Sequence, residues 1–337
     1  MKNIVRSLAI GLAGAAAVTF TANAAEWRFN NPLPEKRPET KEFMMFAEEV
    51  TKNTGGDITM KVYSGGSLGL KNTDVLRFLP KGAVEMSMVW ANYLGRDAPA
   101  LGTVFIQGSI GTVEELNKAL PVVRKIYEEE FANWDVVATG YVALPMLEAS
   151  IFCRDEPIRT LAALKTKKLR VWAKDQVESF TRLGISAQII PQEEMYVALK
   201  TGVVDCAVYP ALYAHTVSLQ EVAKYASFLY PMASGPYILG VAKKNWDKVS
   251  DKNKAVIVAA GKKVWDRTNE YSDDHERELA ARKKLQGMSD LTWLEDFPAA
   301  DRKLFVEAVA ETWKLLADEA GGKAPEYRQR VLDVLGR

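Results

Sequence analysis

Histidine and cysteine are scarce in this 337-residue chain, which has only two of each. His215 and His275 lie far apart in the sequence, and neither has partners at the spacing of metal ligands. The chain also lacks the H-E-x-x-H and G-x-S-x-G motifs and any paired-cysteine site. These absences argue against an enzyme, and they predict a protein with no metal and no cofactor.

No charge of one sign dominates the chain. It has 44 lysines and arginines against 43 aspartates and glutamates, a formal net charge of +1. Nucleic-acid binding usually requires a basic excess or a basic stripe, so we expect no nucleic-acid partner. The glycine-rich run Gly65–Gly69 lacks the Lys-Ser/Thr of a phosphate loop and does not fit G-x-G-x-x-G, which argues against nucleotide binding.

Long apolar runs are missing after the first 24 residues. Lys2 and Arg6 precede an apolar run from Leu8 to Thr21, and Ala22-Asn23-Ala24 fits an A-x-A cleavage signal. Residues 1–24 are therefore predicted to be a cleaved signal peptide, and the protein to be periplasmic. The alternative is a membrane anchor, but the run is shorter than the ~20 residues that span a bilayer.

The remaining chain, roughly 310 residues, is longer than one hydrophobic core usually supports, so two domains are expected. Its two cysteines, Cys153 and Cys206, fall on predicted strands and would be exported to an oxidising compartment. They form either a disulfide or two buried thiols, because sequence spacing does not show which strands are neighbours.

Strand and helix patterns alternate, which is typical of α/β architecture. Strands are predicted at Trp27–Asn30, Ile58–Val62, Glu85–Trp90, Trp134–Gly140, Glu148–Cys153, Leu169–Trp172, Ala187–Pro191, Val203–Val208, Phe228–Pro231 and Tyr237–Ala242. Helices are predicted at Thr40–Asn53, Asn72–Leu79, Val113–Ala132, Glu193–Lys200, Leu212–Glu221 and, as one long helix, Asp251 to about Leu285. The order of these elements predicts that the chain leaves a first domain near Glu148 and returns to it near Gly235.

Arg170 is the most informative single residue because it stands inside an apolar strand pattern, between Leu169 and Val171. Ligands of α/β sheets bind beyond the carboxyl ends of the strands. A guanidinium placed there has a planar fork of donors that suits a carboxylate. The competing interpretation is a solvated edge residue, since Lys167 and Lys168 stand beside it.

Two blocks of sequence carry a family resemblance. The first is FAEEVTKNTGGDITMKVYSGGSLG, from Phe46 to Gly69. The second runs from Leu164 to Pro210 and includes LKTKKLRV, LG, EMY, AL and GVVD in order. Both blocks resemble the substrate-binding proteins of TRAP transporters, the DctP-like family. The resemblance implies a two-domain clamshell of mixed sheets flanked by helices, with a long helix near the C-terminal third that braces both domains.

The resemblance also implies domain bounds and partners. Domain I would comprise residues 25–147 and about 235–272, and domain II residues 148–234 and about 273–337. The protein would be a monomeric receptor that binds an organic acid and delivers it to the small and large membrane subunits of a TRAP transporter. A periplasmic enzyme and a ligand-sensing partner of a signalling receptor are the alternatives.

The resemblance makes Arg170 the carboxylate anchor, while Tyr209 replaces the asparagine that the family usually has before Pro210. A phenol cannot reproduce the donor and acceptor pair of an amide. Together with the aromatic residues near predicted strand ends, this favours a monocarboxylate, and a C4 dicarboxylate is the alternative. The predicted ligand-binding residues are Arg170, Tyr209, Trp172, Trp90, Asn92, Tyr213 and Asn31.

Overall fold

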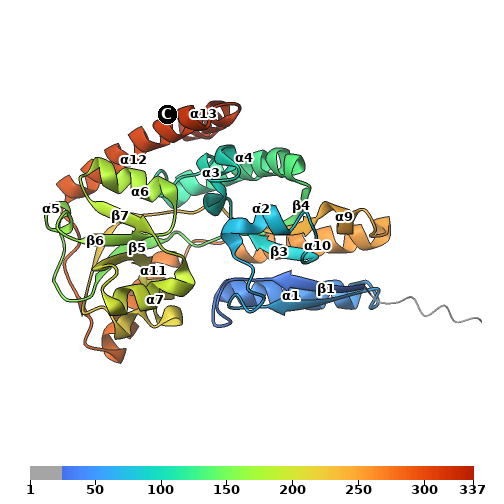
Figure 1. The fold of residues 1–337 in the computed structure, drawn as a ribbon, viewed down its shortest axis with the longest axis horizontal. Coiled ribbons are helices and arrows are strands. Elements are labelled where there is room, and N and C mark those ends of the chain that lie inside the picture. The colour runs from blue at the N-terminus through green and yellow to red at the C-terminus, as the bar shows by residue number, and fades with distance from the viewer. Residues whose placement is uncertain (1–24) are drawn as a thin grey trace, which may run out of the picture.

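The computed structural model describes residues 25–337, so the predicted signal peptide lies outside the described residues. Two sheets form two lobes (Figure 1). Lobe I has the strand order β2 (Ile58–Tyr63), β1 (Ala25–Asn30), β3 (Met86–Val89), β10 (Tyr237–Ala242) and β4 (Val136–Val142). Lobe II has the order β11 (Thr292–Trp293), β9 (Tyr225–Pro231), β5 (Glu148–Cys153), β8 (Cys206–Pro210), β6 (Lys168–Val171) and β7 (Ser186–Ile189).

Helices cover both sheets. Those that precede β5 are α1 (Pro38–Asn53), α2 (Val75–Phe78), α3 (Pro99–Thr103) and α4 (Val113–Phe131). Those between β5 and β10 are α5 (Leu161–Leu164), α6 (Lys174–Arg182), α7 (Gln192–Thr201) and α8 (Ala211–Ala214). The last are α9 (Lys243–Trp246), α10 (Asp251–Thr268), α11 (Asp274–Met288), α12 (Ala299–Ala320) and α13 (Ala324–Leu335).

Both sheets are mixed, as predicted. In lobe I, β1 runs parallel to β2 and β3, and β10 is inserted antiparallel between β3 and β4. In lobe II, β5 runs antiparallel to β8 and β9, whereas β6 is parallel to β7 and β8. Parallel neighbours bring the carboxyl ends of β6 and β8 to the same sheet edge, and this edge faces lobe I.

A disulfide joins Cys153 to Cys206. The two residues stand directly opposite each other on β5 and β8, with Cα atoms 4.1 Å apart. Of the two readings of the sequence, the disulfide is therefore the right one. It fixes β8, the strand that ends in Tyr209 and Pro210, to the centre of the lobe II sheet.

The chain passes between the lobes through residues 143–147 and again through residues 232–236. A third connection is α12, which packs against α6 of lobe II and against α3 on the other side (Figure 1). The final helix, α13, packs against α4 and α3. The C-terminal helices thus join both lobes.

The prediction of one continuous helix from Asp251 to about Leu285 is wrong. The chain forms α10 and α11 instead, with a break at residues 269–273. Glu270 turns its carboxylate back to accept hydrogen bonds from the backbone N–H groups of Tyr271 and Ser272. These local bonds compete with the helical pattern. The bracing role belongs to α12 rather than to a helix over 251–285.

The predicted helix Leu212–Glu221 is also interrupted. It consists of the short α8 followed by two 3-10 turns, with Ser218 between them in a left-handed conformation at φ 54°. An L-residue in that region cannot continue a right-handed helix.

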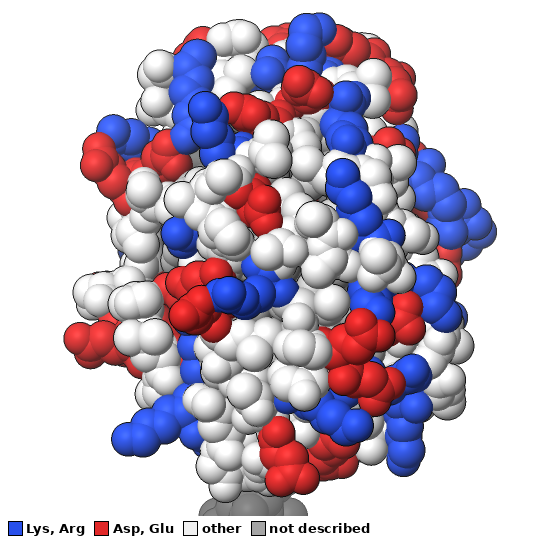
Figure 2. All heavy atoms as spheres, turned by 90° about the vertical axis from the view of Figure 1, so that its left-hand side faces the viewer, with Lys and Arg blue, Asp and Glu red and all other residues white. Residues whose placement is uncertain are grey.

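Charges of both signs are interspersed on the face of lobe II that Figure 2 shows, in keeping with the balanced composition. Within residues 25–337, none of the helices combines the length and the apolar character that a bilayer span requires.

Candidate functional site

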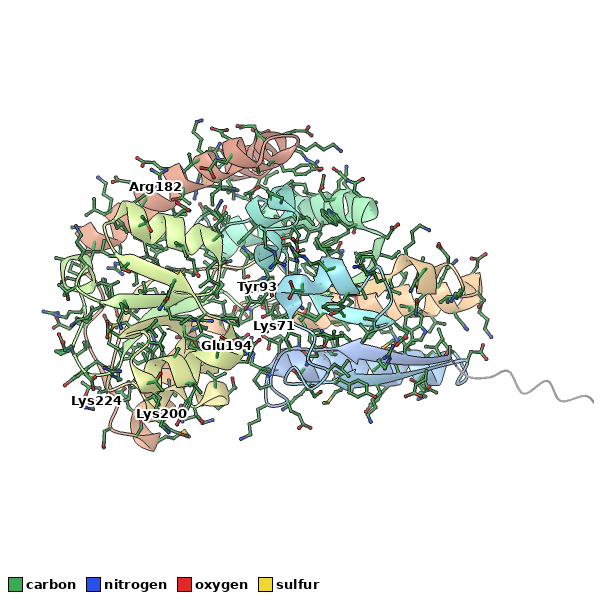
Figure 3. The ribbon with its side chains drawn as sticks, in the orientation of Figure 1. Lys71, Tyr93, Arg182, Glu194, Lys200 and Lys224 are labelled. Atoms are coloured by element: carbon green, nitrogen blue, oxygen red, sulfur yellow. A yellow bond between two sulfur atoms is a disulfide. The ribbon has the colours of Figure 1, made fainter. Side chains whose placement is uncertain are left out.

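A cavity lies between the two lobes, at the carboxyl ends of β6 and β8. The space between its walls, counted with its open mouth, is about 810 Å³. Six aromatic side chains line it: Trp90, Tyr93, Trp172, Tyr209, Tyr213 and Tyr237. Its charged and amide residues are Arg37, Lys71, Asn72, Arg170, Gln192 and Glu193. Figure 3 shows Tyr93 and Lys71 of lobe I near Glu194 of lobe II, where the lobes meet.

Arg170 points from β6 into this cavity and is only 1% exposed. Its Nε donates to the carbonyl oxygen of Ile190 at 2.9 Å, and its Nη1 donates to that of Val208 at 3.2 Å. Within the described residues it has no carboxylate partner within 4 Å. Burial lowers the pKa of its guanidinium. Glu193 of the lining acts from a greater distance to raise this pKa. A buried cation that forms no direct ion pair is unfavourable, so the positive charge of Arg170 favours an anion beside it.

Trp172 supplies a second unused donor two residues further along. Its side chain is 5% exposed and lines the cavity, and its indole nitrogen has no hydrogen-bond partner among residues 25–337. The Arg170 guanidinium carbon lies 5.7 Å from the centre of the Trp172 ring and 5.9 Å from that of Tyr209. An acceptor group of a ligand beside Arg170 would satisfy this N–H group, which otherwise stays buried and unpaired.

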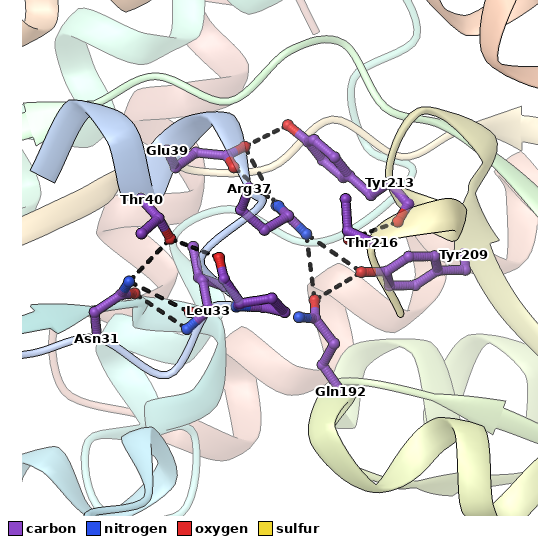
Figure 4. A network of polar contacts seen from close by, with 10 residues as sticks. Asn31, Leu33, Arg37, Glu39, Thr40, Gln192, Tyr209, Tyr213 and Thr216 are labelled. Carbon is purple, nitrogen blue, oxygen red and sulfur yellow. Dashed lines mark hydrogen bonds and ion pairs between the residues drawn. The ribbon is translucent and has the colours of Figure 1, made fainter. Parts of the chain in front are cut away.

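Arg37 is the centre of a polar network that crosses between the lobes (Figure 4). It lies just before α1 and pairs with Glu39 through Nε at 2.9 Å and Nη2 at 3.2 Å. Its Nη1 reaches into lobe II, to the Tyr209 hydroxyl at 3.2 Å and to Oε1 of Gln192 at 3.3 Å. The guanidinium also lies 3.4 Å from the centre of the Tyr213 ring, and the Tyr213 hydroxyl donates to Glu39.

The network keeps the Arg37–Glu39 pair ionised. Burial disfavours the charge of Arg37, but Glu39 and the surrounding phenols more than offset it, and the pKa of Arg37 is raised well above its usual value. Burial likewise acts to raise the pKa of Glu39, while Arg37 and the hydroxyl of Tyr213 lower it to a net value below the usual range.

The tyrosines of the cavity are neutral hydrogen-bonding groups. Burial is the main cause that raises the pKa of each of the four. Tyr209 and Tyr213 use their hydroxyls in the Arg37 network. The four are Tyr93, Tyr209, Tyr213 and Tyr237.

Two of the predicted ligand-binding residues do not line the cavity. Asn31 is fully buried, accepts a hydrogen bond from the N–H group of Leu33 and donates to Thr40, so it stabilises the proline-rich turn after β1. Asn92 donates to the carbonyl oxygen of Phe105 at 2.8 Å and lies beside α3. Neither amide lines the cavity in this structure, so neither is placed as the prediction requires, although among the described residues Oδ1 of Asn92 has no hydrogen-bond partner. The other five predicted residues line the cavity together.

Sequence reasoning missed Arg37, Tyr93, Gln192 and Lys71. Arg37 and Lys71 lie in irregular segments, where no periodicity indicates the direction of a side chain. Gln192 begins α7, where the acidic residues Glu193 and Glu194 indicate only a helix start and not a binding site. The position of Gln192 directly after Ile190 and Pro191 was the one available signal, since it follows a predicted strand.

A further contact joins the lobes at the N-terminus of α6. The carboxylate of Asp175 accepts a hydrogen bond from the backbone N–H group of Gln107 at 2.6 Å. Asp175 is 4% exposed, and burial raises its pKa to about 6. Among residues 25–337, no cluster of three or more histidine, cysteine, aspartate or glutamate side chains could hold a metal ion.

Comparison with known proteins shows which family this chain resembles in sequence and in fold. Residues 29–319 match the family model of bacterial extracellular solute-binding proteins, family 7. A TRAP periplasmic solute-binding protein from Sulfitobacter, solved with bound β-D-galacturonate, is 25% identical, with a TM-score of 0.79 over 93% of this chain and 100% of that chain.

Two curated relatives extend the comparison. The C4-dicarboxylate-binding periplasmic protein DctP of Rhodobacter capsulatus is 25% identical over 331 residues, which cover 94% of this chain and 93% of DctP. A solute-binding protein of Chromohalobacter salexigens is 26% identical over 262 residues, 76% of each chain. The chain therefore belongs to family 7 of the bacterial extracellular solute-binding proteins, the periplasmic binding proteins of TRAP transporters.

Proposed function

We propose that the protein is a periplasmic receptor that binds an organic acid between its lobes and delivers it to the small and large membrane subunits of a TRAP transporter. One observation carries the proposal: Arg170 is buried in the cavity wall without a carboxylate partner among the described residues. The carboxylate of the ligand supplies the missing charge. The N–H groups of Arg170 that do not donate to Ile190 and Val208 remain free to bind it.

The proposed ligand is a monocarboxylate. The aromatic walls suit an acid with a ring or a branched body better than a short acyclic diacid. The Sulfitobacter relative binds galacturonate, which has one carboxylate, whereas the Rhodobacter relative is named for C4 dicarboxylates. A C4 dicarboxylate is therefore the second candidate, and a thermal-shift screen with galacturonate, aromatic acids, branched acids, succinate and malate distinguishes the two.

We further propose that the lobes are domains that close on the ligand and that the protein acts as a monomer. Domain I comprises residues 25–147 and about 235–272, and domain II residues 148–234 and about 273–323. We now assign α13 to domain I rather than domain II, since it packs against α4 and α3. Small-angle scattering should show a monomer whose radius of gyration falls on addition of the best acid of the screen. An unchanged radius at saturation would contradict closure.

Substitution of Arg170 tests the anchor. Arg170→Lys keeps the charge but loses the planar fork, so calorimetric titration should show at least a tenfold loss of affinity for the best acid. The matched control is Arg182→Lys, which changes an arginine of the same lobe that pairs with Glu311 on the surface (Figure 3). Equal affinity of the Arg170→Lys variant and the control would refute the proposal.

The alternatives predict different results. An enzyme would convert the acid during incubation, whereas a receptor returns it unchanged, and chromatography of the mixture after prolonged incubation decides. A sensor partner would bind the same acid but would not support uptake when reconstituted with the two membrane subunits in vesicles.

A further inference from the structure

Three cationic side chains line the cavity: Arg37, Lys71 and Arg170. A ligand with two carboxylates would need two of them. Their partners differ, because two of the three are paired with carboxylates and the third is not. Lys71 lies at the mouth, with its side chain 60% exposed, and pairs with Glu194 across the cleft at 3.5 Å. A solvated lysine in such a pair binds a further anion weakly.

Arg37 is the only other buried cation of the cavity lining, with 3% exposure. Its Nε and Nη2 form a two-point ion pair with Glu39, and its Nη1 donates to Tyr209 and Gln192. The Tyr213 ring covers its face. Four of the five N–H groups of Arg37 thus have acceptors within the described chain, and one face of the guanidinium is covered. Glu39 itself is 4% exposed and ionised beside the cavity, so it also repels a second carboxylate.

We propose that Arg37, held by Glu39, is a specificity-determining residue that restricts the site to one carboxylate. The pair withdraws the second buried guanidinium from the ligand and leaves Arg170 as the single anion anchor. This inference rests on the proposed function, because it concerns the ligand of the same site. It assigns to Glu39 the role of a positioning residue, acting on the ligand through Arg37.

The same pair joins the lobes. Arg37 and Glu39 belong to lobe I, and their partners Tyr209, Tyr213 and Gln192 belong to lobe II (Figure 4). The proposed closure would assemble this network and hold Tyr209 near both guanidinium groups: its hydroxyl accepts from Arg37, and its ring centre lies 5.9 Å from the guanidinium carbon of Arg170. Closure and exclusion of a second charge are two results of one set of contacts.

The test is a change of ligand preference on removal of one charge. Glu39→Gln keeps the shape of the side chain and frees Arg37 to act as a second anchor. Succinate and its monomethyl ester have nearly the same size and differ by one charge. Calorimetry and thermal shift should show that the preference for succinate over the ester rises at least tenfold in Glu39→Gln relative to the unmodified protein. An equal preference in both proteins, including no response in either, would overturn the proposal.

A double variant guards against a folding failure. Arg37→Gln with Glu39→Gln removes both buried charges, an exchange that proteins often tolerate. On the proposal, the preference of this variant for succinate over the ester returns to that of the unmodified protein, because no second guanidinium is left to bind the extra charge. A preference as high in the double variant as in Glu39→Gln would show that Arg37 is not the second anchor, and the proposal would fall. Failure of Arg170→Lys to weaken binding would instead refute the proposed function.

Discussion

Gly261 of α10 packs directly on Gly140 of β4. A Cβ atom added to Gly261 would lie 2.1 Å from the carbonyl oxygen of Thr139 and 2.8 Å from the Cα of Gly140. Both obstacles are backbone atoms of the sheet, so neither can turn aside as a flexible side chain would. The absence of side chains at this pair allows the helix to approach the strand closely enough to cover the edge of the lobe I sheet.

Gly261→Ala should therefore lower the free energy of unfolding by about 2 kcal/mol or more, because the helix must move away from the sheet. The matched control is Gly287→Ala in α11, where an added Cβ meets nothing within 4 Å. That change should raise stability by up to about 1 kcal/mol, since alanine favours the helix. Denaturant unfolding of both variants measures the two changes in free energy. Equal changes would show that the close approach of α10 to β4 does not require glycine at position 261.

The indole N–H group of Trp172 is predicted to bind the ligand. Trp172→Phe keeps an aromatic wall and removes the donor, so the affinity for the best acid should fall about tenfold, the usual size for a hydrogen bond to a charged group. Calorimetric titration measures the change. Trp134→Phe, at a tryptophan that does not line the cavity, is the control. Unchanged affinity in Trp172→Phe would mean that the ring alone matters.

Asp175 predicts a dependence of stability on pH. Burial raises its folded-state pKa from 3.8 to about 6. Between these two values the unfolded chain ionises the group and the folded chain keeps it protonated, so this group lowers the stability as pH rises from about 4 to about 6. Asp175→Asn removes the effect and retains an acceptor for Gln107. Relative to the unmodified protein, the variant should gain about 2–3 kcal/mol between pH 4 and pH 7.5. A constant difference across this range, measured by urea unfolding, would contradict the assignment.

Loss of the disulfide should weaken lobe II. Cys153 and Cys206 are separated by 53 positions in the sequence, and a loop of this size gives a stabilisation of about 2–4 kcal/mol. The double substitution Cys153→Ala and Cys206→Ala should lower the unfolding free energy by that amount. A reducing agent should destabilise the unmodified protein and leave the double variant unaffected. Equal sensitivity of both proteins to the reductant would show that the loss of stability does not come from reduction of this disulfide.

Regular, apolar segments were the most predictable part of the molecule. The predicted bounds of β5 and β10 are those observed, and α1 and α4 differ from prediction by at most two residues at either end. Strands and amphipathic helices repeat one pattern over several residues, so local sequence determines them. The break between α10 and α11 depends instead on a side chain that turns back to its own backbone, which periodicity does not reveal.

The candidate site was predictable where it lies on strands. Arg170, Trp172 and Tyr209 follow strand patterns, and the parallel pairing of β6 with β8 brings their ends together. Arg37 was missed because its place in the site arises from the approach of two lobes. No short stretch of sequence indicates that a loop before α1 meets the beginning of α7. The same limit applies to Asn31 and Asn92, which were predicted to bind the ligand but lie outside the cavity lining and form hydrogen bonds to neighbouring loops.

The position of β10 has a consequence for how the molecule is made. This strand separates β3 from β4 in the lobe I sheet, although more than ninety residues of chain, about the size of a small domain, lie between β4 and β10 in the sequence. The N-terminal half therefore cannot complete its own sheet until the ribosome has made β5 to β9 of lobe II. A nascent chain without Tyr237–Ala242 has the edges of β3 and β4 unpaired, and only a polypeptide that extends to Ala242 can close them. The lobe I sheet, which begins first in the sequence, thus receives its fifth strand only after β5 to β9 of lobe II have been made.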